Sequence, residues 1–171
     1  MNTPSPLPIQ INSLIEALRD ELQQYGEMLA LLDQQQEHIT QRAADEVLHS
    51  AVAVTEQMDR IRAARAQRET RQRELAAALQ CEPDASFANL LPRLPQAYQP
   101  AVSALVQENN DLLARVQQRA RQNHLLLCRA VELMQQFVQG LAAAHPPPIY
   151  TGCGLLQPSP TPPSPIYEAV G

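Results

Sequence analysis

The sequence predicts an all-α protein: an antiparallel bundle of three long helices, with a short helical connector and a disordered proline-rich C-terminal tail. Hydrophobic residues make up 44% of the 171 residues but aromatic residues only 4%, so a core must consist mainly of aliphatic side chains, as in bundles. Five glycines are too few for the turns of a many-stranded sheet protein. Proline, which interrupts helices, is absent from positions 9–82 and 101–145. We therefore predict a helical domain at 1–144 and a tail at 145–171.

The N-terminal half carries two stripes of apolar residues with helical spacing. Ser13 and Glu16 have the spacing of a capping box, which predicts that the first helix begins at Ser13. The heptad phase slips near residues 39–51, which favours a turn at residues 41–45 with Asp45 as the N-cap of a second helix. The alternative is one continuous rod, which would be ~100 Å long and could not bury its own stripe.

The last long helix is predicted at residues 101–143 and has the clearest pattern. Its apolar stripe covers three neighbouring heptad positions, enough to contact two other helices. We interpret Asn109 and Asn123, which interrupt the stripe, as residues that fix the helix register. Part of the stripe near its C-terminal end could instead remain free for a partner helix. The residues concerned are Leu126, Leu127, Leu133, Met134, Phe137 and Leu141.

Two proline-rich segments flank this helix. Residues 83–100 place apolar side chains between prolines, which predicts a packed connector with a short helical turn. Residues 145–171 contain eight prolines and few bulky apolar side chains, so we expect an extended tail. The tripeptide Pro-Ile-Tyr occurs twice in this tail, either as a docking motif or by chance.

Charge and cysteine content argue against several classes of function. The net charge of −5 disfavours binding of the whole chain to nucleic acid or to anionic membranes. Three widely spaced cysteines form no disulfide framework, and no segment has the apolar length of a signal peptide or a membrane span. We therefore expect a cytoplasmic protein without membrane insertion. No catalytic motif and no cofactor-binding motif is recognisable, so we expect neither an enzyme nor a cofactor.

Two local features could still indicate binding chemistry. Residues 60–73 contain six arginines and one glutamate, a pattern that a nucleic-acid contact could use. We favour a solvated face that pairs with the acidic first helix, because no aromatic side chains accompany the arginines. Arg65, Arg68 and Gln72 also occupy seam positions, so we expect the packing to be weakest there. His124 and Cys128 lie one helical turn apart but lack further metal ligands nearby in the sequence.

Several segments, taken in order, resemble the FlgN family of flagellar type III export chaperones. They are the Leu/Glu/Gln-rich first helix ending in residues 31–39, the following helix at 47–61 and the sequence Asn-His-Leu-Leu-Leu at 123–127. The last helix is followed by residues 150–154, which resemble a Tyr-Gly-x-x-Gly turn of the family, although Thr151 replaces its first glycine. The resemblance covers residues 10–154, and the extension beyond Gly154 has no counterpart.

The resemblance implies an acidic cytoplasmic chaperone that binds hook-associated subunits of the hook–filament junction before export. It implies that the last helix holds the client, with Asn123 among the contacts, and that Tyr150 and Gly154 dock to the cytoplasmic domain of the export gate. An apolar helix stripe suits this role because it can accept an amphipathic client helix. Two other hypotheses remain: a self-assembling structural bundle without a client, and an arginine-stripe nucleic-acid binder. A homodimer is compatible with the pattern.

Overall fold

The computed structural model describes residues 6–144, which are almost entirely helical and contain no strand. The predicted all-α class with long helices is thereby confirmed. The predicted tail at 145–171, with its two Pro-Ile-Tyr sequences, lies outside the described residues. The elements are α1 (Pro6–Thr40), α2 (Ala44–Ala78), α3 (Phe87–Leu90), the 3₁₀ turn η1 (Leu91–Arg93) and α4 (Gln99–Ala144).

The described chain divides into two compact units, and the division falls within α4. Unit 1 ends at Cys128 and contains α1, α2, the connector and the first part of α4. Unit 2 begins at Arg129, and its described part is the helical segment 129–144.

Helix α1 begins earlier than the sequence predicted. Its first residue is Pro6, so the predicted start at Ser13 is wrong and Ser13 lies inside the helix. Proline is favoured at the first position of a helix, because its fixed φ suits the helix and its missing N–H would have had no partner. Pro6 and Pro8 therefore lie in the first turn of the helix instead of excluding it.

The predicted turn between the first two helices is confirmed at residues 41–43, which excludes the continuous rod. Arg42 adopts a left-handed conformation with φ 58°. The N–H groups of Arg42 and Ala43 donate to the carbonyls of Ile39 and His38 at 3.2 and 3.0 Å, the pattern of a Schellman motif without glycine. Ala43, not Asp45, precedes α2, so the predicted Asp45 cap is wrong. Asp45 lies in the first helical turn, where its charge interacts favourably with the helix dipole.

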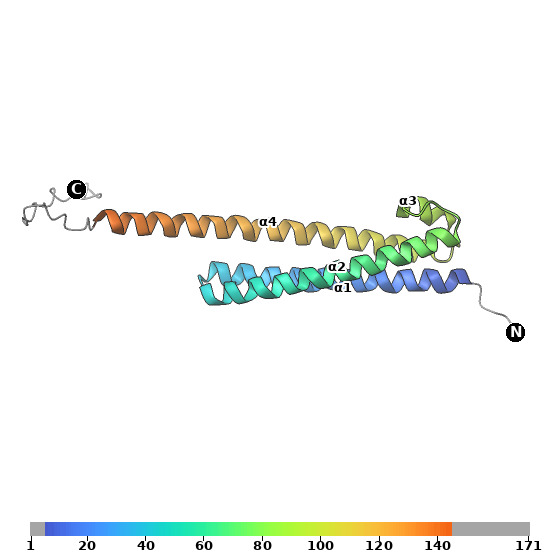
Figure 1. Cartoon of the computed structure of the whole chain (residues 1–171), viewed down its shortest axis with the longest axis horizontal. Helices are drawn as coiled ribbons and strands as arrows, with labels where there is room; N and C mark the ends of the chain where they lie inside the picture. The colour runs from blue at the N-terminus through green and yellow to red at the C-terminus, as the bar shows by residue number, and fades with distance from the viewer. Residues whose placement is uncertain (1–5, 145–171) are drawn as a thin grey trace, which may run out of the picture. The chain divides into compact units, whose positions relative to one another are not determined.

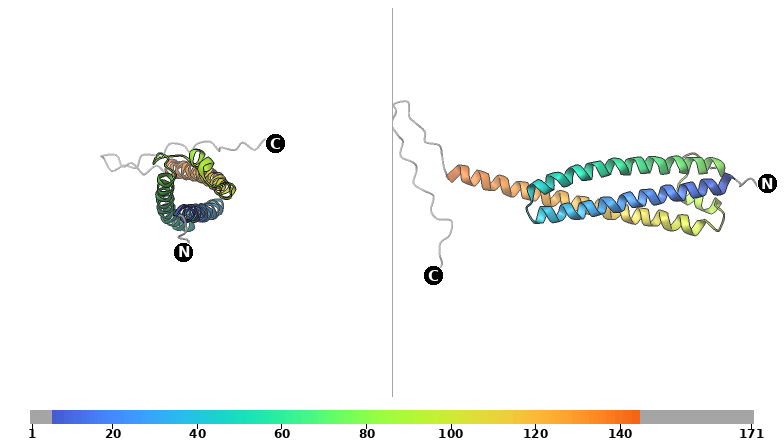
Figure 2. Two further views of the ribbon diagram at one scale, coloured as in Figure 1. Left: turned by 90° about the vertical axis from the view of Figure 1, so that its right-hand side faces the viewer. Right: turned by 90° about the horizontal axis from the view of Figure 1, so that it is seen from below.

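In unit 1 the three long helices lie side by side (Figure 1 and Figure 2). Hydrogen bonds join Gln57 of α2 to residue 24 and Arg68 of α2 to residue 21, so α2 runs opposite to α1. Bonds from Asn109 and Asn123 of α4 reach residues 18 and 32 respectively, so α4 runs in the same direction as α1. Helix α1 is thus the common partner of the other two helices in this bundle.

Two apolar clusters fill the bundle along its length. The first is centred on Leu14 of α1, Leu75 of α2 and Val102 of α4, and the second on Tyr25, Met28 and Leu32 of α1 with Val116 of α4. The connector closes the first cluster, because Leu94 is buried in it and Phe87 packs against it. This confirms the predicted packed connector with a short helical turn.

The two seam asparagines bind α1 as register residues should. The Nδ2 of Asn109 donates to the carbonyls of Leu18 and Leu105 at 3.0 and 2.9 Å. The Nδ2 of Asn123 donates to the carbonyl of Leu32 at 2.7 Å and to Oε1 of Gln35 at 3.1 Å. Both bonds to α1 carbonyls join residues 91 positions apart, because each helix advances by two heptads between them. A shift of either helix by one residue would break both bonds together.

Asn109→Asp should lower the free energy of unfolding by about 2 kcal/mol, since the buried amide donor becomes a carboxylate facing two carbonyl oxygens. The adjacent Asn110→Asp makes the same chemical change on the exposed side of the helix and should shift stability by less than about 0.5 kcal/mol. Urea denaturation followed by circular dichroism measures both variants. Equal losses would show that the amide contact does not fix α4 on α1.

Candidate functional site

The candidate site is an exposed apolar surface on the last turns of α4, in unit 2. Every residue from 129 to 141 is exposed, including large apolar side chains. At 100° per residue these large side chains fall within an arc of about 160°, and the opposite side carries Glu132 and the glutamines 135 and 139. We call this surface the unit-2 face; it consists of Val131, Leu133, Met134, Phe137, Val138 and Leu141.

Within residues 6–144, the register between α1 and α4 in unit 1 ends before the positions of the unit-2 face. Side-chain hydrogen bonds and ion pairs between α1 and α4 join residues 83 to 91 positions apart. Because α1 ends at Thr40, no residue of α1 remains to pair in this register with α4 positions beyond 131. The apolar heptad pattern of α4 nevertheless continues to Leu141. A segment with this pattern normally packs against another helix.

The structure places the predicted client-binding residues in different surroundings. Leu133, Met134, Phe137 and Leu141 all belong to the unit-2 face. Asn123 lies in unit 1, is only 2% exposed and has its amide bonded to α1. The predicted export-gate residues Tyr150 and Gly154 lie outside the described residues.

The other two predicted client contacts are Leu126 and Leu127, which precede the unit-2 face. Leu126 is 38% exposed and Leu127 is half-buried, and both belong to unit 1. The sequence analysis missed Val131 and Val138, which occupy none of the three heptad positions that it followed. A helical projection restricted to the last turns would have found them, because there the apolar arc widens.

The arginine-rich segment 60–73 contacts acidic residues of this chain. The buried carboxylate of Glu21 in α1 pairs with Nε of Arg68 at 2.9 Å and with Nε of Arg65 at 3.5 Å. The Tyr25 hydroxyl donates to Glu21 at 2.8 Å and accepts from Nη2 of Arg65 at 2.9 Å. The interpretation as a face that pairs with the acidic first helix is confirmed for these two arginines.

Around this cluster, burial and hydrogen bonding change the ionisation of two groups. Burial and the bond to Glu21 raise the pKa of Tyr25 above its usual value of 10.0. The hydrogen bond to Tyr25 raises the pKa of Arg65 above its usual value. Arg68 also donates to Gln72, whose amide donates to the carbonyl of Ala85 at 2.8 Å. At the predicted weak point of the packing, a polar network therefore links α1, α2 and the connector.

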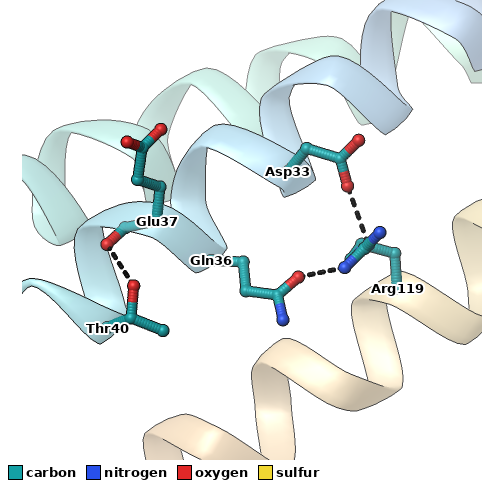
Figure 3. Close-up of a pocket in the computed structure, with 5 residues that line it drawn as sticks. All are labelled: Asp33, Gln36, Glu37, Thr40 and Arg119. Carbon is teal, nitrogen blue, oxygen red and sulfur yellow. Dashed lines mark hydrogen bonds and ion pairs between the residues drawn. The ribbon is translucent and has the colours of Figure 1, made fainter.

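A shallow, open depression lies between α1 and α4 in unit 1 (Figure 3). Nε of Arg119 pairs with Oδ1 of Asp33 at 2.7 Å, and its guanidinium also donates to Gln36. The hydroxyl of Thr40 donates to the carbonyl of Glu37 at 2.8 Å. Arg119 and Asp33 neutralise each other here, and the Glu37 carboxylate accepts a hydrogen bond from the amide of Gln41 at 3.1 Å. The depression is therefore a polar contact between two helices.

Residues 6–144 contain neither a cluster of three metal-ligating side chains nor a helix suited to span a membrane. His124 and Cys128 approach within 3.6 Å, but in this part of the chain no three metal-ligating side chains cluster together. None of the described helices combines the length and apolarity needed to cross a bilayer. The unit-2 face is therefore the feature on which the functional argument rests.

Comparisons with known proteins identify one family. A family model described as "FlgN protein" matches residues 1–157 of the chain. No curated protein and no solved structure matches it. The matched region contains all the described helices and extends past Tyr150 and Gly154.

Stability should fall as the pH rises above about 10, because the unfolded chain then loses the Tyr25 proton that the folded chain retains. Below this pH the stabilisation that the protonated Tyr25 hydroxyl provides is fully present. The Tyr25→Phe variant lacks this hydroxyl and serves as the comparison. At pH 9 the free energy of unfolding of the wild type should exceed that of the variant by about 1–2 kcal/mol, and this difference should decrease towards about pH 11. Urea denaturation at each pH measures the difference. A difference that stays constant would contradict the raised pKa.

Proposed function

Because this chain belongs to the FlgN family of flagellar export chaperones, we propose that it binds hook-associated subunits in the cytoplasm and delivers them to the export gate. The observation that supports this proposal is the unit-2 face. Its six large apolar side chains are exposed side by side on one helix, and surfaces of this kind usually contact other proteins. Binding the subunits before export would shield their own association surfaces.

The spacing of the unit-2 face suits a helical client. Met134, Phe137, Val138 and Leu141 follow the i, i+3, i+4, i+7 pattern by which amphipathic helices contact each other. Segment 129–141 contains one arginine and one glutamate, so its net charge is zero and its polar side is mainly glutamine. Apolar contact, more than charge attraction, would therefore provide the affinity for a client helix.

The remaining predicted contacts have different places in this proposal. Leu126 and Leu127 belong to unit 1 and not to the unit-2 face, and we propose them as additional client contacts. Asn123 is left out of the proposed contact surface, since its buried amide already binds α1. Tyr150 and Gly154 are proposed, by the family resemblance, to dock to the cytoplasmic domain of the export gate.

The proposal predicts that Phe137→Asp weakens client binding by at least about tenfold, because a charge replaces an exposed aromatic anchor. Gln139→Asp adds the same charge on the opposite side of the helix and should leave affinity within about twofold of the wild type. The measurement is calorimetric titration of the full chain with C-terminal segments of hook-associated subunits. Phe137 is 64% exposed, so the substitution should not disturb folding.

Two further outcomes separate the alternatives. Tyr150→Ala should bind the client as the wild type does and lose affinity for the cytoplasmic domain of the export gate. Loss of client binding in this variant would contradict the division of roles between helix and tail. If the wild type binds no client segment and sediments as a stable oligomer, the self-assembling bundle is the correct hypothesis instead.

A further inference from the structure

A glycine lies at the edge of the unit-2 face, inside the helix. Gly140 occupies the heptad position that Leu105, Leu112 and Leu133 occupy in earlier turns of α4. Glycine weakens a helix relative to alanine, so a helix-interior glycine calls for a reason. Gly140 has no left-handed backbone conformation, and within the described chain a Cβ at this position would meet nothing within 4 Å. The fold of residues 6–144 therefore does not explain it.

The interface between α1 and α4 contains a comparable glycine with its neighbour in place. Gly26 lies inside α1, and a Cβ built on it would be 4.0 Å from Cδ2 of Leu112 on α4. Leu112 is itself a seam residue that packs against the second core cluster. In this protein, then, the end of a leucine side chain lies over a helix-interior glycine where two parallel helices meet.

Large side chains near Gly140 shape the surface around it. Leu133 lies seven residues before it and Phe137 three residues before it, so both are on its side of the helix, and both are exposed. Phe137 is one helical turn from the residue without a Cβ and forms one wall of a notch open to an approaching helix, and Leu133 continues this side a turn further back. Knobs-into-holes packing fills such a notch with one side chain of the partner.

We propose that Gly140 is the acceptor notch of the client surface and takes a leucine-class side chain of the client helix. The notch sets the client's register, because only one aliphatic side chain of an amphipathic helix can enter it while its neighbours contact Phe137 and Met134. This inference rests on the proposed function, since it specifies the chemistry of the same client. The occupant is an amphipathic helix that continues the heptad pairing that α1 provides in unit 1.

Gly140→Ala tests the notch in the full chain. The added methyl group fills the notch while raising helix propensity, so the variant keeps its fold and client affinity should fall about tenfold. Gln139→Ala removes an exposed side chain from the same turn, on the side of the helix opposite the unit-2 face, and should leave affinity within about twofold of the wild type. Calorimetric titration with the C-terminal segments of hook-associated subunits measures both variants.

The same titrations show whether a negative result contradicts only the proposed notch or also the proposed function. Unchanged or tighter binding by Gly140→Ala, with Phe137→Asp still defective, would overturn the notch and leave the client surface standing. Absence of binding by the wild type would overturn both. One leucine of the client segment should be the side chain that enters the notch. Replacing it with alanine should weaken binding to the wild-type chaperone about tenfold and should have little further effect on binding to the Gly140→Ala variant.

Discussion

Three buried amide side chains donate to backbone carbonyls of α1, and the arrangement of the bundle depends on them. Gln57 of α2 donates to the carbonyl of Gln24, while Asn109 and Asn123 of α4 donate to those of Leu18 and Leu32. A carbonyl inside a helix has a second lone pair, so each bond leaves the ladder of α1 intact. Apolar seams alone tolerate small axial shifts, but a shift by anything other than whole heptads would move these amides away from the carbonyls that they bind. α1 therefore aligns both neighbouring helices.

The polar cluster at Glu21 adds a second constraint between α1 and α2. Its carboxylate is buried and accepts from Tyr25, Arg65 and Arg68, so neither its charge nor its lone pairs remain without partners. The network continues through Gln72 to the connector. Polar contacts thus fix the geometry of unit 1, and in unit 2 the α4 pattern continues without α1. The unit-2 face, which is exposed among the described residues, is the surface proposed for the client.

Much of this fold could be predicted from the sequence, since proline positions and apolar spacing are local signals. The turn at residues 41–43 followed from the slip in heptad phase. Its boundaries did not, because an arginine takes the left-handed position that usually marks a turn by glycine. The start at Pro6 was missed because proline was treated as excluding a helix, although it favours the first turn. The role of Asn109 and Asn123 was predictable because a polar residue in an apolar seam has few other uses.

The candidate site was only partly predictable. Leu133, Met134, Phe137 and Leu141 emerged from the heptad pattern, but the pattern does not reveal where a neighbouring helix ends. Asn123 was therefore grouped with the exposed leucines although α1 covers it. Val131 and Val138 lie off the seam and become part of one surface because no residue in the described part of the chain covers that side of the helix. Burial depends on contacts between residues about 90 positions apart, which local spacing does not contain.

The central claim is that the client lies on the unit-2 face, and hydrogen exchange of the full chain locates it most directly. Amide exchange is measured by mass spectrometry with and without a saturating C-terminal segment of a hook-associated subunit. The account predicts that the client slows exchange most strongly in residues 129–141, where an exposed helix becomes packed, and leaves the centres of α1 and α2 unchanged. Protection confined to α1 and α2, with none in residues 129–141, would contradict it.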